Sequence, residues 1–126
     1  LPTEWEWQQA ATEGDPSRIY PWGPDWEGGH ANTQETGIFR TVAVGMYPLG
    51  ASPVGAMDMG SNIREWCLNE FSNITRTETN STRSRSLRGA SFSCVKDFSQ
   101  TIARHSDDPD EQPSDDGFRV VFAPEL

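Results

Sequence analysis

The stretch that decides the fold is Met57-Asp58-Met59-Gly60-Ser61-Asn62-Ile63-Arg64-Glu65-Trp66, residues 57–66. Its two carboxylates, Asp58 and Glu65, stand seven residues apart around a Gly-Ser-Asn turn. Such a turn can direct backbone carbonyls inward between the acids, which predicts a cage made only of oxygen atoms. Calcium prefers such ligands, whereas zinc would require Cys or His within the stretch. The alternative is a turn with two solvated acids.

The composition indicates one small acidic domain. A chain of 126 residues with 34% hydrophobic content can bury one modest core, which predicts a single domain over residues 1–126. The net charge of −9 disfavours nucleic acid and anionic membranes as partners, since both would repel the surface. A cation, a basic protein or a neutral ligand fits better. Because no apolar run approaches the roughly 18 residues of a membrane span, we expect this chain to be soluble.

Helix signals are clearest near the first residue. Thr3 and Glu6 match a capping box and predict a helix that runs to about Thr12 and is closed by Gly14. We expect its apolar stripe to combine Trp5 with Gln9 or Ala10, one turn later.

Most of the remaining chain is predicted to be irregular. Glycines and prolines recur from residue 20 to residue 60, where buried aromatics such as Trp22 and Trp26, or metal ions, would have to order the loops. Residues 72–86 read as a solvated loop. Strands are expected at residues 86–89 and 117–122, with a short strand or turn at 99–103.

Several short sequence words occur in an order that is specific as a set. They are Leu1-Pro2-Thr3-Glu4 with Glu6-Trp7, Tyr20-Pro21-Trp22-Gly23, Ala31-Asn32-Thr33, Met57-Asp58-Met59-Gly60-Ser61-Asn62 with Glu65-Trp66, Leu87-Arg88-Gly89-Ala90-Ser91-Phe92, Arg104 and Gly117-Phe118-Arg119. In this order, the words resemble the formylglycine-generating enzyme, or sulfatase-modifying factor, family across essentially the whole chain.

The resemblance implies an α+β fold of the C-type lectin-like, formylglycine-generating-enzyme type. Such a fold has little regular secondary structure, a small twisted antiparallel sheet, about two helices and loops ordered by calcium. In the family the Leu-Pro-Thr-Glu word falls partway through the domain. The resemblance therefore also implies that this chain lacks an N-terminal portion, either as a fragment or as half of a two-chain assembly.

The same resemblance implies two calcium sites. The first would use the side chains of Asp58 and Glu65 with the carbonyl oxygens of Ser61 and Ile63. The second would use Asn32, the carbonyl oxygens of Thr33 and Ile38, and a family carboxylate at the position of Thr36. A hydroxyl is a weaker calcium ligand than a carboxylate, so the second site is doubtful unless Glu35 or Asp25 supplies the acid.

Aerobic enzymes of the family hold copper(I) between two cysteines five residues apart and convert a substrate cysteine to formylglycine. Cys94 matches the first cysteine, but Ser99 stands at the second. Copper(I) binds thiolates well and neutral hydroxyls poorly, so a copper site is disfavoured. If the chain is an enzyme nonetheless, Cys94 is its candidate catalytic residue.

The other candidate chemical groups receive unreactive interpretations. Cys67 is expected to be buried, and two free thiols are favoured, although a Cys67–Cys94 disulfide stays open. His30 and His105 read as exposed loop histidines. With Lys96 they are the only candidate bases for Cys94, and no pattern orients them.

Relatives of the family also include non-catalytic lectin-fold proteins, among them the variable proteins of diversity-generating retroelements. These diversify the segment before the Gly-Phe-Arg word to bind different ligands. The resemblance implies these contact residues here: Phe92, Ser93, Val95, Lys96, Phe98, His105, Ser106, Asp108, Gln112, Ser114 and Asp115. The acidic residues between Asp107 and Asp116 would face a cation or basic partner, or simply water.

Together these observations favour a non-catalytic binding module for a protein or other macromolecular ligand, on a calcium-ordered scaffold. The alternative is a copper-dependent formylglycine-generating oxidase or a related oxygen-dependent enzyme. A third possibility is a structural half-domain that assembles with its missing N-terminal portion or with a partner chain. The sequence does not indicate a cellular compartment.

Overall fold

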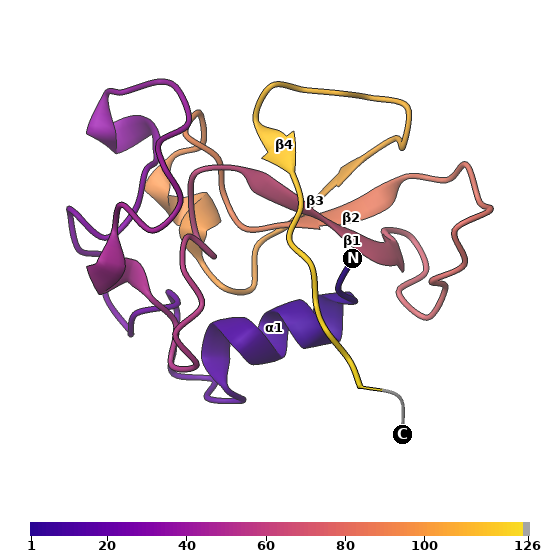
Figure 1. The fold of residues 1–126 in the computed structure, drawn as a ribbon, viewed down its shortest axis with the longest axis horizontal. Helices are drawn as coiled ribbons and strands as arrows, with labels where there is room; N and C mark the ends of the chain where they lie inside the picture. The colour runs from indigo at the N-terminus through magenta and orange to yellow at the C-terminus, as the bar shows by residue number, and fades with distance from the viewer. Residues whose placement is uncertain (125–126) are drawn as a thin grey trace.

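A computed structural model describes residues 1–124, whose regular structure comprises one α-helix, three 3-10 turns and one four-stranded sheet (Figure 1). Within this part of the chain no helix has the length and apolarity needed to cross a bilayer. The elements in chain order are α1 (Glu4–Thr12), η1 (Gln34–Thr36), η2 (Pro48–Gly50), β1 (Arg64–Glu70), β2 (Arg85–Arg88), η3 (Lys96–Ser99), β3 (Arg104–Asp107) and β4 (Asp116–Gly117).

Helix α1 begins with the predicted capping box. The Glu6 amide donates to the Thr3 hydroxyl, and the Glu6 carboxylate accepts from the Thr3 amide at 2.7 Å. The predicted apolar stripe is wrong, because Trp5 is 53% exposed and the buried face carries Glu4, Trp7 and Ala11. The helix therefore docks through a buried acid and an indole at helical spacing rather than through a purely apolar face.

The sheet has the order β3-β2-β1-β4. Strand β2 pairs antiparallel with both β1 and β3, as predicted, but β4 runs parallel to β1, so the sheet is mixed. The strand predicted over residues 117–122 is wrong except at Gly117. Residues 118–124 leave the sheet and run alongside α1 without a strand partner among the described residues (Figure 1).

The predicted strand before Gly89 is confirmed as β2, and the chain turns sharply where it ends. Gly89 has φ +79, and an added Cβ would lie 2.7 Å from the Met59 carbonyl oxygen. Glycine is required there on both counts, since other residues rarely adopt this φ and a side chain would collide with the backbone. This close approach brings the Asp58–Glu65 loop against the end of β2.

The apolar core is small and lies between α1 and the sheet. Its central cluster consists of Trp7, Ala11, Met59 and Cys67, and Leu87 on β2 is also fully buried. Charged groups extend it, because the Glu4 carboxylate, 1% exposed, accepts hydrogen bonds from Arg88 and Arg104. Buried charges persist only when they are paired in this way.

The long segment from residue 20 to residue 60 is irregular, as predicted, and contains only η1 and η2. Aromatic rings pack together at its start: the Tyr20 and Trp22 rings stack at 5.2 Å, and Trp26 meets both edge-on at 5.6 Å. The loop predicted over residues 72–86 ends two residues early, since Arg85 and Ser86 belong to β2 and are buried.

Candidate functional site

The first predicted calcium loop brings three of its four expected ligand residues to one pocket. Asp58, Ile63 and Glu65 line a pocket of about 250 Å³ beside Arg119. The fourth, Ser61, is buried, and its carbonyl accepts from the Ile63 amide at 3.0 Å. Asp58 has a left-handed backbone with φ 58 and accepts from the Gly45 amide through Oδ2 at 2.8 Å. Its Oδ1 is buried and has no hydrogen-bond partner in residues 1–124.

Glu65 is shared between the predicted metal loop and two protein donors. Its Oε2 accepts from the Trp7 indole at 2.8 Å and from Arg119 Nε at 2.7 Å, while Oε1 accepts from Arg119 Nη2 at 2.7 Å. A carboxylate oxygen accepts about two hydrogen bonds, so Oε1 keeps one lone pair. Glu65 Oε1 and the unpartnered Asp58 Oδ1 are therefore the two carboxylate oxygens of this loop with room for a further ligand, and no third His, Cys, Asp or Glu side chain joins them in residues 1–124. Arg119, which the sequence did not single out, lowers the net negative charge of this loop.

The second predicted calcium loop does not fit a metal in the same way. Thr36 Oγ1 lies 3.0 Å from Asn32 Oδ1 and 2.8 Å from the Thr33 carbonyl oxygen, and its single proton is shared between these two acceptors. Glu35, a candidate replacement acid, points both carboxylate oxygens at other donors, Thr33 Oγ1 and the Lys96 amide. In residues 1–124, no three His, Cys, Asp or Glu side chains gather at a metal-binding distance.

Cys94 lies at the end of a chain of hydroxyl groups. Its sulfur is 3.3 Å from Ser91 Oγ, and Ser91 and Ser93 both donate to Asp115 Oδ2 at 2.6 Å. Burial would raise the pKa of Asp115, but these hydrogen bonds and the Arg64 charge hold that pKa below its usual value. The chain of hydroxyls therefore links the Cys94 sulfur, through Ser91, to the Asp115 carboxylate.

No second thiol completes a copper site in the described chain. Cys67 and Cys94 are both free, as favoured by the sequence. Cys67 is buried in the core, and burial raises the pKa of its thiol to about 12. Ser99, at the position of the second family cysteine, is 1% exposed, and its Oγ has no hydrogen-bond partner among residues 1–124.

Both histidines differ from the expectation of exposed loop residues. His30 is half-buried against the Trp22 ring, and its Nδ1 lies 3.2 Å from the Gly28 carbonyl. His105 is half-buried on β3, and burial together with the Arg64 and Arg88 charges lowers its pKa. Neither histidine, nor Lys96, hydrogen-bonds to the Cys94 sulfur in the described residues, where its side-chain partner is the Ser91 hydroxyl.

The expected ligand contacts fall into two groups. The first, which we name the ligand loop, covers residues 91–98 with Asp115 and His105. In it Ser93 bonds to Asp115, and the Phe98 and His105 rings lie 5.1 Å apart. The Phe92 amide donates to the Asn62 carbonyl at 3.1 Å, which joins this loop to the first predicted calcium loop, residues 58–65, called the first metal loop below. The exposed members of this loop are Ser93, Val95, Lys96, Asp97 and Phe98.

The second group lies elsewhere, because successive residues of a strand face opposite sides of a sheet. Ser106 and Asp108 line a different pocket, of about 290 Å³, with Phe71 and Arg83. Asp108 also accepts from the Ser84 hydroxyl at 2.6 Å. Gln112 and Ser114 are exposed on the loop that leads to Asp115. The eleven expected contacts are therefore not one continuous set.

Arg64 and Asp116 lie beside the ligand loop and were missed by the sequence analysis. Arg64 Nε donates to Asp116 Oδ1 at 2.6 Å, and its guanidinium lies 3.5 Å from Asp115. The Asp116 side chain is 2% exposed, so burial raises its pKa, and Asp115 adds to the effect, although Arg64 opposes it. Arg64 thus partly neutralises two acids that the sequence shows only as part of an acidic run.

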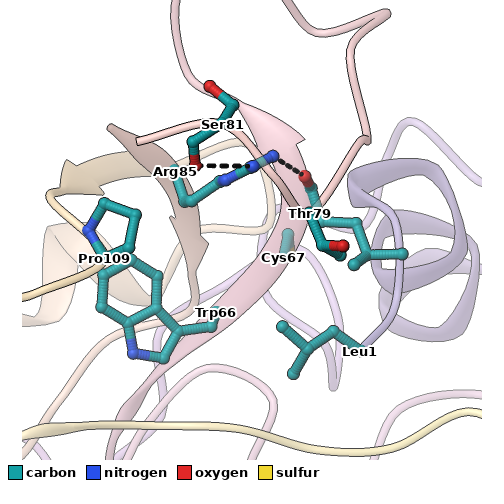
Figure 2. Close-up of a pocket in the computed structure, with 8 residues that line it drawn as sticks. Leu1, Trp66, Cys67, Thr79, Ser81, Arg85 and Pro109 are labelled. Atoms are coloured by element: carbon teal, nitrogen blue, oxygen red, sulfur yellow. Dashed lines mark hydrogen bonds between the residues drawn. The ribbon is translucent and has the colours of Figure 1, made fainter. Parts of the chain in front are cut away.

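A further pocket, of about 290 Å³, lies beside β1 (Figure 2). Leu1, Trp66 and Pro109 form apolar walls around Arg85. The Arg85 guanidinium donates to the carbonyl oxygens of Leu68, Glu78 and Ser81. Because Arg85 holds residues 78–81 in place with these hydrogen bonds, its role in this pocket is structural.

The model of the Sulfatase-modifying factor enzyme 1-like domain matches residues 1–124. The chain belongs to the formylglycine-generating enzyme family. It is 33% identical over 146 residues to the formylglycine-generating enzyme of Streptomyces coelicolor, covering 96% of this chain and 46% of that protein. It is 28% identical to the inactive C-alpha-formylglycine-generating enzyme 2 of Bos taurus, covering 96% and 43%.

Among solved structures, the Treponema denticola variable protein 1 superposes with a TM-score of 0.76 and 25% identity, covering 94% of this chain and 45% of that one. The fold predicted from the resemblance is thereby confirmed. The chain spans a little under half the length of these two curated relatives. Those relatives include proteins named as active and as inactive, so membership of the family alone does not assign catalysis.

Proposed function

We propose that this chain is a non-catalytic binding module whose ligand loop contacts a protein or other macromolecule. The observation that carries the proposal is Ser99, a buried serine at the second family cysteine position. Copper(I) held by one thiol and one neutral hydroxyl would be weakly bound. The surroundings of Cys94 add support, because among the described residues its sulfur lies against the Ser91 hydroxyl and hydrogen-bonds to neither a histidine nor a second thiol.

The ligand class follows from the exposed side chains. Val95 and Phe98 are 40% and 45% exposed and could serve as apolar anchors beside the polar Ser93 and Lys96. The net charge of −9 favours a neutral or basic ligand. The likeness to a variable protein supports a surface that differs among relatives. Coding DNA with a near-identical template repeat that differs mainly at adenines would establish diversification of this segment.

Copper binding and oxidase activity test the proposal directly. The chain is titrated with copper(I) against a chelator, and aldehyde formation is assayed on a Cys-X-Pro-X-Arg peptide. We expect neither tight binding nor aldehyde. The Ser99→Cys variant restores the second thiol and should bind copper(I) more tightly than the parent chain. Aldehyde formation by the parent would instead establish the alternative, a copper-dependent oxidase, which its identity to the Streptomyces coelicolor enzyme favours.

We further propose that calcium orders the first metal loop. Asp58 and Glu65 would hold it with the carbonyl oxygens of Ser61 and Ile63, and the buried, unpartnered Asp58 Oδ1 supports this assignment. Calcium should raise the melting temperature of the parent chain relative to EDTA. Asp58→Asn should abolish that shift, whereas Asp110→Asn, at an exposed acid, should retain it. A calcium shift that survives in Asp58→Asn would refute the site.

A further inference from the structure

The loop formed by Asn32 to Ile38 closes on its own hydrogen bonds. The Thr36 hydroxyl lies 3.0 Å from Asn32 Oδ1 and 2.8 Å from the Thr33 carbonyl oxygen. Both oxygens belong to residues with no exposed surface, and both would be ligands of a cation in this loop. The Thr36 hydroxyl proton, which carries a partial positive charge, therefore faces the two oxygens that a metal ion would otherwise bind.

Both oxygens have protein donors within hydrogen-bond distance. The Thr33 carbonyl also accepts from the Thr36 amide at 3.0 Å, which uses both of its lone pairs. The Asn32 amide group is fixed at its other end, where Nδ2 donates to the Arg40 carbonyl at 2.9 Å and to Asn62 Oδ1 at 3.2 Å. A cation would have to displace the Thr36 hydroxyl to bind here.

The nearest acid in this loop serves the ligand loop instead. Glu35 Oε1 accepts from the Lys96 amide at 2.8 Å, and Oε2 accepts from Thr33 Oγ1 at 2.7 Å. Burial would raise the pKa of Glu35, but these hydrogen bonds outweigh it and hold the pKa below its usual value. The Gln34 amide donates to the Cys94 carbonyl at 2.9 Å, which makes a second direct tie.

We propose that Asn32–Ile38 is a metal-free brace for the ligand loop, with the Thr36 hydroxyl in place of a cation. The chain then takes at most one calcium ion, in the first metal loop. The brace itself does not depend on that ion. The suggestion that the brace serves ligand binding rests on the function proposed above, whereas the brace itself does not.

Ion stoichiometry separates the two metal proposals. Native mass spectrometry in calcium should find one ion on the parent chain, none on Asp58→Asn, two on Thr36→Asp and one on the double variant. No ion on the parent with one on Thr36→Asp would support the brace and refute calcium at Asp58. A bound ion on Asp58→Asn would overturn the brace. A Thr36→Asp variant that gains no ion would also overturn the assignment of Thr36 to a cation position.

Hydrogen exchange at the Lys96 amide tests the bracing. In the Asp58→Asn background its protection should be the same in calcium and in EDTA. Thr36→Val removes the hydroxyl while keeping the shape, and should speed exchange about tenfold, as loss of roughly one hydrogen bond implies. Thr36→Ser should restore protection, and Thr41→Val, at an exposed threonine, should leave it unchanged. Unchanged exchange in Thr36→Val would refute the brace.

Discussion

The helix side of the sheet buries charged side chains, whereas the segment over residues 118–124 exposes large apolar ones. In most proteins charged side chains are exposed and large apolar ones are buried. On the helix side, Glu4 is 1% exposed, and Arg88 is also buried. In the segment, Val120 is 76% exposed and Phe122 is 92% exposed. The molecule buries charge in one region and exposes large apolar groups in the other. Burial here follows available hydrogen-bond partners rather than hydropathy.

The buried charges are supported on every side. Arg104 donates to both Glu4 oxygens at 2.8 and 2.9 Å, and Arg88 lies 4.8 Å from the Trp7 ring while it donates to the Thr101 and Ala103 carbonyls. The segment over residues 118–124 has no backbone hydrogen bond to the rest of the described chain. The Arg119 side chain hydrogen-bonds it to Glu65 and to the Met57 carbonyl.

The largest effect is expected from Glu4→Gln. Removing one partner of a buried ion pair leaves the other charge uncompensated and costs about 3–5 kcal/mol of unfolding free energy. Chemical denaturation measures the loss. Glu6→Gln, at the exposed capping-box position, should cost under about 0.5 kcal/mol, because glutamine also completes this motif. Similar losses in both variants would mean that the buried network does not stabilise the fold.

Acid should weaken the same network. Burial would raise the pKa of Glu4, but Arg104 and Arg88 outweigh it and hold this pKa below its usual 4.5. The stability that Glu4 contributes is therefore fully present above pH 4.5 and is lost as the pH falls through the pKa of Glu4 in the folded state. His105, with its pKa lowered from 6.5, adds an earlier loss that begins near 6.5. Asp116, whose pKa is raised above 3.8, acts in the opposite direction, because it adds stability as the pH falls from its folded pKa towards 3.8. Denaturation at stepped pH should show that Glu4→Gln flattens the decline below 4.5 and leaves the one near 6.5.

Arg119→Gln should have an intermediate effect, because it joins the two regions. The variant leaves Glu65, with a side chain 5% exposed, only the Trp7 indole as a donor. We expect a loss of about 2–3 kcal/mol in EDTA, in the range for a charged hydrogen bond. If calcium binds beside Glu65, its addition should recover part of this loss. Equal losses with and without calcium would count against the first metal loop as a calcium site.

Local patterns predicted the elements that depend on neighbouring residues. The capping box of α1, the strand before Gly89 and the irregular segment from residue 20 to residue 60 were all predicted correctly. Local patterns did not predict which side chains are buried where a residue far along the chain provides the partner. Glu4 is buried because Arg88 and Arg104 reach it across 84 and 100 residues, and no local pattern contains them.

The candidate site shows the same limit. The acids Asp58 and Glu65 and the serine at position 99 could be identified from the sequence. The pairing of Arg119 with Glu65 could not, nor could the alternation along β3 that separates Ser106 from His105. The segment 117–122 reads as a strand because its residues favour β structure, but a strand also requires a neighbouring backbone to pair with.

The smallest effect is expected in the exposed segment. Phe122→Ser should change the unfolding free energy by less than about 0.5 kcal/mol, because a side chain already in water loses little burial. Leu87→Ala, at a fully buried core position, should cost about 2–5 kcal/mol. Binding of a hydrophobic dye should fall in Phe122→Ser, since Phe122 helps to line an apolar groove with Trp5 and Val54. A large loss of stability in Phe122→Ser would show that the exposed segment contributes to the fold after all, and the contrast with the buried charges would then fail.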